Sequence, residues 1–190
     1  MPSAPILCLG AHWKACDVYW KTAAENGALY GVNSRKLTGP QVNHAQQTGI
    51  YILYGDYKPV YVGQANGSLF ARLQMHYRKD DLVGRWDTFT WVGMRRALSG
   101  DDPNLSNNES NFNISKGQLL DHFEAAMIHA FEPPMNGQEG RFGEAVIRYS
   151  QIRDDRLGPS DRELLEMLLR ATNALPDGIR ITATGWREDD

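Results

Sequence analysis

The chain has few cysteines, no long apolar run and no excess of positive charge, and each shortage excludes a class of protein. Cys8 and Cys16 are the only cysteines among 190 residues, and they do not form a Cys-x-x-Cys pair. A domain of this size does not depend on a disulfide, so a reducing compartment is favoured. No apolar run approaches the roughly 18 residues of a membrane span, and a secretion-signal pattern is missing at the start. We therefore expect no membrane association and a cytoplasmic location.

The formal net charge of −3 argues against a large, non-specific nucleic-acid surface, because such surfaces neutralise phosphates with Lys and Arg. A local basic groove is still compatible with this total. Hydrophobic residues make up 42% and charged residues 23% of the chain, close to average globular usage. We predict a single domain over residues 1–190.

The stretch GIYILYGDYKPVYVGQA, residues 49–65, predicts a β-hairpin, because two apolar and aromatic runs flank a turn-forming cluster. Tyr51 and Tyr61 each lie beside a glycine, in Gly-Ile-Tyr and Tyr-Val-Gly. Tyrosine is a common strand residue, so these two side chains could simply fill the sheet. A functional interpretation needs other residues that converge on the same place.

Further elements follow the hairpin. Ser68 is a predicted N-cap for a helix over 69–77, on which Arg72 and His76 lie one turn apart on the same face. A third strand is predicted over 87–92, and a helix with an apolar stripe over 118–131 carries Glu124. The polar segment 99–117 is predicted to be a flexible insertion. Additional helices are predicted over 17–27 and 160–171, and additional strands over 145–152 and 178–184.

This ordered set resembles the GIY-YIG nuclease family, over a region from about Gly49 to Phe142. Arg-x-x-x-His on the first helix, and a Glu-Ala-Ala helix followed by Pro, Asn and Gly-Arg-Phe, are most similar to the restriction-endonuclease branch. The resemblance implies an α/β (α+β) fold: a small central, mostly antiparallel sheet flanked by helices. The nuclease core would span 49–143, with an N-terminal extension over 1–48 and a C-terminal extension over 144–190.

The resemblance also implies a metal-dependent DNA endonuclease with six catalytic residues: Tyr51, Tyr61, Arg72, His76, Glu124 and Asn136. Phosphodiester hydrolysis needs an activated water, a cation on the non-bridging oxygens and charge compensation. Glu124 is the member of the set that can bind Mg²⁺ or Mn²⁺ strongly. The fork of donors on Arg72 matches a phosphate, and the amide of Asn136 suits a positioning role.

The identity of the general base stays open between Tyr51 and His76. A tyrosine base needs its pKa lowered from about 10, by Arg72 or by the metal. His76 can accept a proton near neutral pH, from water or from a tyrosine hydroxyl. We favour Tyr51, because a strand residue is held more rigidly.

The predicted partner is double-stranded DNA, and a homodimer is an open alternative to a monomer. Residues expected to contact DNA flank the predicted site: Gln64, Arg78, Lys79, Arg85 and Arg141. Gln64 stands where many family members have lysine, and Asp80 and Asp81 dilute the basic charge. Besides a sequence- or structure-selective endonuclease acting in restriction or defence, two alternatives remain: a non-specific, toxin-like nuclease and a catalytically inactive nucleic-acid-binding module.

Overall fold

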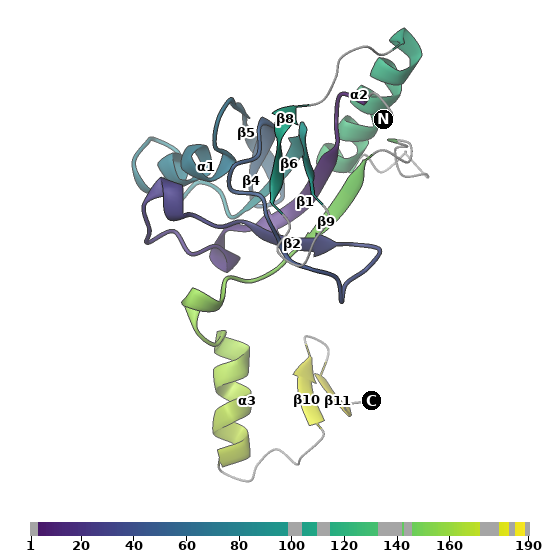
Figure 1. Ribbon diagram of the computed structural model, residues 1–190. Coiled ribbons are helices and arrows are strands. Elements are labelled where there is room, and N and C mark those ends of the chain that lie inside the picture. The colour runs from purple at the N-terminus through teal and green to yellow at the C-terminus, as the bar shows by residue number, and fades with distance from the viewer. Residues whose placement is uncertain are drawn as a thin grey trace. The chain divides into compact units, whose positions relative to one another are not determined.

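The computed structural model describes residues 4–98, 104–109, 115–132, 142, 146–171, 179–182 and 185–188. These residues form three α-helices and three β-sheets (Figure 1). The chain divides into two compact units, Met1–Asp154 and Asp155–Asp190, where the sequence predicted a single domain. All described residues of the predicted site lie in the first unit.

A seven-stranded sheet forms the centre of the first unit, with the strand order β3-β2-β9-β1-β6-β4-β5. The strands are β1 (Cys8–Lys14), β2 (Tyr30–Asn33), β3 (Val42–Asn43), β4 (Gly49–Gly55), β5 (Lys58–Ala65), β6 (Thr88–Gly93) and β9 (Ile147–Gln151). Every neighbouring pair is antiparallel except β1 and β9. This confirms the predicted mixed α/β content and mostly antiparallel sheet.

The sheet is larger than the small one predicted, because both predicted extensions contribute strands to it. β1, β2 and β3 come from residues 1–48, and β9 comes from residues 144–190. β9 lies between β1 and β2, near the middle of the sheet. The segments on either side of the predicted core are therefore parts of the same sheet.

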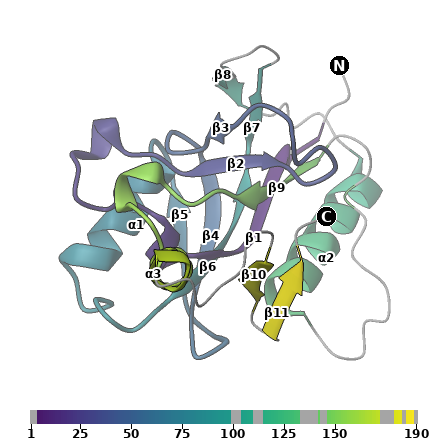
Figure 2. The ribbon, with the colours of Figure 1, turned by 90° about the horizontal axis from the view of Figure 1, so that it is seen from below.

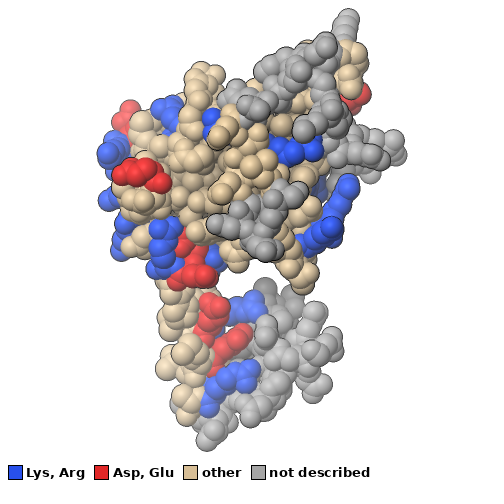
Figure 3. All heavy atoms as spheres, in the orientation of Figure 1, with Lys and Arg blue, Asp and Glu red and all other residues tan. Residues whose placement is uncertain are grey.

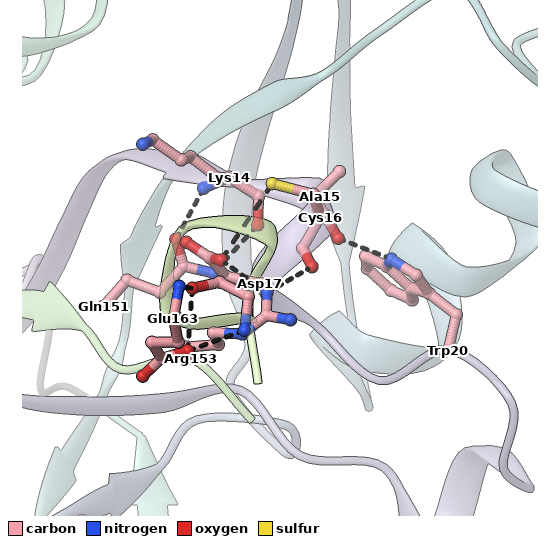
Figure 4. A network of polar contacts seen from close by, with 9 residues as sticks. Lys14, Ala15, Cys16, Asp17, Trp20, Gln151, Arg153 and Glu163 are labelled. Atoms are coloured by element: carbon pink, nitrogen blue, oxygen red, sulfur yellow. Dashed lines mark hydrogen bonds and ion pairs between the residues drawn. The ribbon is translucent and has the colours of Figure 1, made fainter. Parts of the chain in front are cut away.

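Side-chain contacts also join β1 to β9 at one end, as Figure 4 shows. The Lys14 amide donates to Oε1 of Gln151 at 2.5 Å, and Nε2 of Gln151 donates to the Lys14 carbonyl at 2.9 Å. Just beyond the strand ends, Nη1 of Arg153 lies 3.2 Å from Oδ1 of Asp17. These contacts hold the last residues of the first unit, which ends at Asp154, against the end of β1.

The predicted hairpin is confirmed as β4 and β5. Its two turn residues, Asp56 and Tyr57, have φ angles of 50° and 62°. Positive φ at both positions belongs to the tight turn that matches the twist of an antiparallel hairpin. β4 also pairs with β6 on its other side, so the Gly-Ile-Tyr strand is enclosed by two neighbours.

Helices cover both faces of β4. α1 (Leu69–Arg78) begins after Ser68, whose Oγ accepts a hydrogen bond from the Ala71 amide at 3.1 Å, which confirms the predicted cap. α2 (Lys116–Phe131) packs on the opposite side, as Figures 1 and 2 show. Successive strand residues alternate between faces. Tyr51 contacts α1, whereas Ile50 and Ile52 line a groove with α2.

The predicted helix over residues 17–27 is wrong. Residues 17–27 do not form an α-helix; two short 3₁₀ turns, Ala15–Asp17 and Ala24–Asn26, stand on either side of Trp20. Trp20 stacks on Phe70 and Tyr77 of α1, and its Nε1 donates to the Ala15 carbonyl at 2.8 Å (Figure 4). Burial of this indole against α1 overrides the weak local helix preference.

The predicted flexible insertion 99–117 contains a strand and the start of a helix. β8 (Leu105–Glu109) pairs with β7 (Arg95–Ala97) in a separate two-stranded sheet. The first turn of α2 is closed by a capping box between Ser115 and Gln118. The capping box satisfies backbone amides with polar side chains. Leu105 of β8 and its partner Ala97 of β7 pack against the hydrophobic core.

The second unit contains a 3₁₀ turn (Asp155–Leu157), α3 (Asp161–Ala171) and a hairpin of β10 (Ile179–Thr182) with β11 (Gly185–Glu188). The predicted capping box is confirmed: the Ser160 amide donates to Oε2 of Glu163 at 2.6 Å, and the Glu163 amide donates to Oγ of Ser160 at 3.3 Å. Within the described ranges of the chain, no helix combines the length and apolar character that a membrane crossing needs.

Candidate functional site

The centre of the candidate site is a hydrogen bond between the Gly-Ile-Tyr strand and the first helix. The Tyr51 hydroxyl lies 2.7 Å from Nε2 of His76. Both side chains are buried, with 0% of Tyr51 and 2% of His76 exposed. The carbonyl of His76 also accepts a hydrogen bond from Nε1 of Trp86 at 3.4 Å. The strand and the helix therefore hold a phenol and an imidazole in a fixed pair.

Asp80 extends this pair to three residues. Its Oδ2 contacts Nδ1 of His76, so both ring nitrogens of the histidine are engaged. Its Oδ1 accepts a hydrogen bond from the Leu82 amide at 3.0 Å. Burial alone would raise the pKa of Asp80, but the Leu82 amide and His76 together lower it below its ordinary value. Sequence reasoning counted Asp80 only as a diluting charge, although it follows His76 by four residues.

Tyr61 and Arg72 complete the group on this face. The Tyr61 ring lies 4.8 Å from the His76 ring and 6.2 Å from the Tyr51 ring, measured between centroids. Burial raises the pKa of Tyr51, and the nearby Arg72 guanidinium opposes that shift only in part. Tyr61 and Arg72 are half-buried, so they are the members of the group that face solvent.

The glycine beside each tyrosine has a steric reason. A Cβ on Gly63 would collide with the Tyr51 hydroxyl and would lie 2.7 Å from the Tyr61 ring. Gly49 has a φ of 146°, and a Cβ there would collide with the Val92 carbonyl of β6. Gly63 therefore makes room for the Tyr51 hydroxyl, and Gly49 lets β4 pair closely with β6.

Glu124, the predicted metal ligand, is not brought to this group. It is exposed on α2, on the opposite side of the sheet from Tyr51. The Tyr54 hydroxyl fixes α2 there by donating to the Ala130 carbonyl at 2.5 Å, and Glu132 pairs with His12 of β1 at 3.3 Å. A magnesium site built on Glu124 therefore does not fit the arrangement around Tyr51.

Asn136 and Arg141 lie outside the described residues. The part of the chain that the structure describes contains no cluster of three or more His, Cys, Asp or Glu that could hold a metal ion. The described residues of the predicted catalytic set that come together are thus Tyr51, Tyr61, Arg72 and His76.

The predicted DNA-contacting residues divide between the two faces. Arg78, Lys79 and Arg85 are exposed at the end of α1 and in the loop after it. Gln64 is opposite Ile50 in the hairpin, so its side chain lies on the α2 face instead. In Figure 3, Lys and Arg alternate with Asp and Glu over the side of the first unit that carries α1. The charge beside the group is mixed rather than continuously basic.

A groove of about 450 Å³ lies on the α2 face of the sheet. Ile50, Ile52 and Val62 line it from the hairpin, and Phe123 and Met127 line it from α2. These five side chains are apolar, and Thr90 and His122 also line the groove. The groove lies on the opposite face of the sheet from the Tyr51 group.

Comparisons with protein-family models, with curated proteins and with solved structures gave no match.

Proposed function

We propose that this chain is a GIY-YIG-type DNA endonuclease that hydrolyses phosphodiester bonds at the group formed by Tyr51, Tyr61, Arg72 and His76. The observation that carries the proposal is the 2.7 Å contact between the Tyr51 hydroxyl and Nε2 of His76, next to Arg72. A phenol paired with a base and an arginine is a set suited to activating water and holding a phosphate.

The geometry suggests how the two candidate bases act together. Burial raises the pKa of Tyr51, which disfavours a free phenolate at neutral pH. A hydrogen bond to His76 avoids that difficulty, because the Tyr51 proton passes to Nε2 as the phenol oxygen takes a proton from the attacking water. The new bond joins the water oxygen to phosphorus, and the leaving deoxyribose oxygen takes its proton from solvent. No free phenolate accumulates in this relay.

Arg72 and Tyr61 are the residues that a DNA phosphate would meet first, because they are the half-buried members of the group. The Arg72 guanidinium can donate two parallel hydrogen bonds to phosphate oxygens and stabilise the charge that develops as the bond breaks. Tyr61 can orient the phosphate or the water by its hydroxyl. Arg78, Lys79 and Arg85 provide cationic side chains nearby for the flanking DNA backbone.

A requirement for Mg²⁺ or Mn²⁺ belongs to this proposal, because a divalent cation would supply charge neutralisation on the phosphate oxygens. We assign no ligand of this cation among the described residues, and therefore no step to the metal. From its place across the sheet, we expect Glu124→Ala to retain cleavage within about threefold, as for a surface residue outside the reacting group.

The test is incubation of the purified protein with supercoiled plasmid, linear duplex and single-stranded DNA, each with Mg²⁺, Mn²⁺ or EDTA. We expect nicking or linearisation of duplex DNA with a divalent cation and none with EDTA. Arg72→Ala should lower the rate by on the order of a hundredfold and change DNA affinity less. Arg35→Ala, at an exposed turn residue, is the control for lost positive charge.

A second candidate function is favoured by the position of Glu124: a nucleic-acid-binding module without nuclease activity. The same experiment separates the two. Binding of DNA by the wild-type protein without cleavage under any metal condition would reject the endonuclease and support the binding module. Equal losses of binding and cleavage in Arg72→Ala would make Arg72 a binding residue instead of a catalytic one.

A further inference from the structure

We infer that Asp80 is a positioning residue for His76, and that it fixes the tautomer in which Nε2 accepts the proton of Tyr51. This inference rests on the proposed function for its catalytic meaning. It rests on the geometry alone for the hydrogen-bond assignment. Asp80 does not touch the Tyr51 hydroxyl and acts only through the imidazole ring.

The two ring nitrogens of His76 have different hydrogen-bond partners. A neutral imidazole carries one N–H donor and one acceptor nitrogen. An ionised carboxylate accepts hydrogen bonds only, so Oδ2 of Asp80 requires the proton on Nδ1. Nε2 is then the acceptor, and the Tyr51 hydroxyl 2.7 Å away is its donor. While His76 is neutral, the direction of each hydrogen bond in the row Tyr51–His76–Asp80 follows from the charge of Asp80.

The carboxylate is itself held in place. Asp80 lies just beyond the end of α1, where its Oδ1 accepts from the Leu82 amide. One oxygen thus anchors the side chain and leaves the other for His76. The side chain is 30% exposed, so the carboxylate keeps part of its contact with water while its inner oxygen meets a histidine that is 3% exposed.

The other groups around His76 do not replace this effect. Tyr51 reaches it from β4, Tyr61 packs on it from β5, and Trp86 donates to its backbone carbonyl. Arg72, from the same helix, is a positive charge that lowers the pKa of Asp80 and so favours its ionised form. Within the described residues, Asp80 is the anionic group that contacts the ring of His76. It also stabilises the imidazolium formed when His76 takes a proton.

The direct test is nitrogen-15 NMR of the full-length protein, which identifies the protonated ring nitrogen of His76. We expect the proton on Nδ1 in the wild-type protein. Asp80→Asn can turn its amide group toward Nδ1, so we expect a mixed or reversed tautomer in that variant. Asp81→Asn, which removes the same charge from the exposed neighbouring residue, should leave the wild-type tautomer unchanged.

The kinetic test compares plasmid cleavage by the same three proteins. Asp80→Asn should lower the single-turnover rate by at least about tenfold, as when an orienting carboxylate behind a catalytic histidine is replaced. Its pH–rate profile should move to lower pH on the acid side, because the imidazolium loses a stabilising negative charge. A urea unfolding curve for each variant separates this effect from a loss of folded protein.

Two outcomes overturn the inference: an unchanged His76 tautomer in folded Asp80→Asn, or cleavage by Asp80→Asn equal to that by Asp81→Asn with the same pH profile. Failure of the proposed function has a different signature. A wild-type protein that cleaves no DNA but holds the Nδ1 tautomer, and loses it in Asp80→Asn, rejects the endonuclease and keeps the hydrogen-bond assignment.

Discussion

Among single residues, the chemistry of the site depends on the pKa of a phenol, Tyr51, that is buried beside an imidazole, His76. Tyr51 is fully buried, and burial raises its pKa. A tyrosine that acted alone as a base would need the opposite shift. The hydrogen bond to His76 therefore joins two residues that sequence reasoning treated as competitors for one role.

Replacing Tyr51 by phenylalanine tests that joint role. Tyr51→Phe keeps the ring and removes the hydroxyl, so cleavage should fall at least about a hundredfold at every pH from 6 to 9. Wild-type cleavage should level off between about pH 8 and 9 instead of rising further, because the raised pKa of Tyr51 lies above that window. Single-turnover rates across this range provide the measurement.

Tyr57→Phe is the matched control, because Tyr57 is 99% exposed at the tip of the same hairpin. It should cleave DNA at the wild-type rate. Removing the Tyr51 hydroxyl also leaves Nε2 of His76 without its donor, which should cost about 1–3 kcal/mol of unfolding free energy. A Tyr51→Phe enzyme within tenfold of Tyr57→Phe at pH 8 would contradict the relay.

His44 predicts how stability depends on pH. It is fully buried among the rings of Trp13, Trp91 and Tyr149, and neither of its ring nitrogens has a hydrogen-bond partner within the described structure. Burial lowers its pKa to about 3. The unfolded chain, with a histidine pKa of about 6.5, binds more protons than the folded protein between these values.

The free energy of unfolding should therefore rise with pH between about 3 and 6.5, and His44 should contribute up to about 1.4 kcal/mol per pH unit to this rise. Above about pH 6.5 the contribution of His44 should be complete and constant. In His44→Leu, which cannot titrate, the slope should be smaller by that amount. Urea unfolding at several pH values measures both slopes. Parallel curves for the two proteins would show that His44 is not buried in its neutral form.

At the scale of elements, the hairpin of β4 and β5 combines a sheet with a reactive group. Tyr51 is paired with Gly63 across the hairpin, and Leu53 is paired with Tyr61, so both tyrosines lie on the face toward α1. The same alternation sends Ile50 and Val62 to the groove on the other face. The pairing register of β4 and β5 thus determines both the tyrosine pair on the α1 face and the apolar groove on the α2 face.

Gly63→Ala should damage the site through this register. Its Cβ would occupy the space of the Tyr51 hydroxyl, so we expect loss of cleavage and a destabilisation of about 1–3 kcal/mol, as for an overpacked core position. Gly67→Ala is the control, because a Cβ there meets nothing within 4 Å. Cleavage and thermal unfolding of both variants are the measurements. Normal activity in Gly63→Ala would show that the hydroxyl is not confined as described.

α2 is the element whose place decides the role of Glu124. Its side chains Phe123 and Met127 are 54% and 62% exposed although they line the groove beside the sheet. The apolar stripe that predicted this helix from the sequence is therefore only partly covered by its own unit. Loss of cleavage in a folded Glu124→Ala protein would show that this carboxylate reaches the reacting group when DNA is bound.

At the scale of the whole molecule, the boundary between the two units makes a prediction about truncation. A chain of residues 1–154 keeps every strand of the seven-stranded sheet and should fold, with cleavage within about threefold of the full-length rate, because a compact unit with its own core folds independently. A chain of residues 1–145 loses β9 from between β1 and β2 and should not fold. Circular dichroism and the plasmid assay test both. Cleavage lost in a folded 1–154 chain would place part of the function in the second unit.

The local elements and the spacing of the motif can be predicted from the amino-acid sequence alone. The hairpin, the helix behind Ser68 and the helix behind Ser160 follow from turn residues, caps and periodicity, which act over a few neighbouring residues. The sequence also indicated one set of six residues: Tyr51, Tyr61, Arg72, His76, Glu124 and Asn136. The three-dimensional fold was needed to show that β1, β2, β3 and β9 join the same sheet, because pairing between distant strands leaves no local pattern. It also decided that Asp80 contacts His76 and that α2 carries Glu124 to the opposite face, since the face a helix covers depends on packing across the whole sheet.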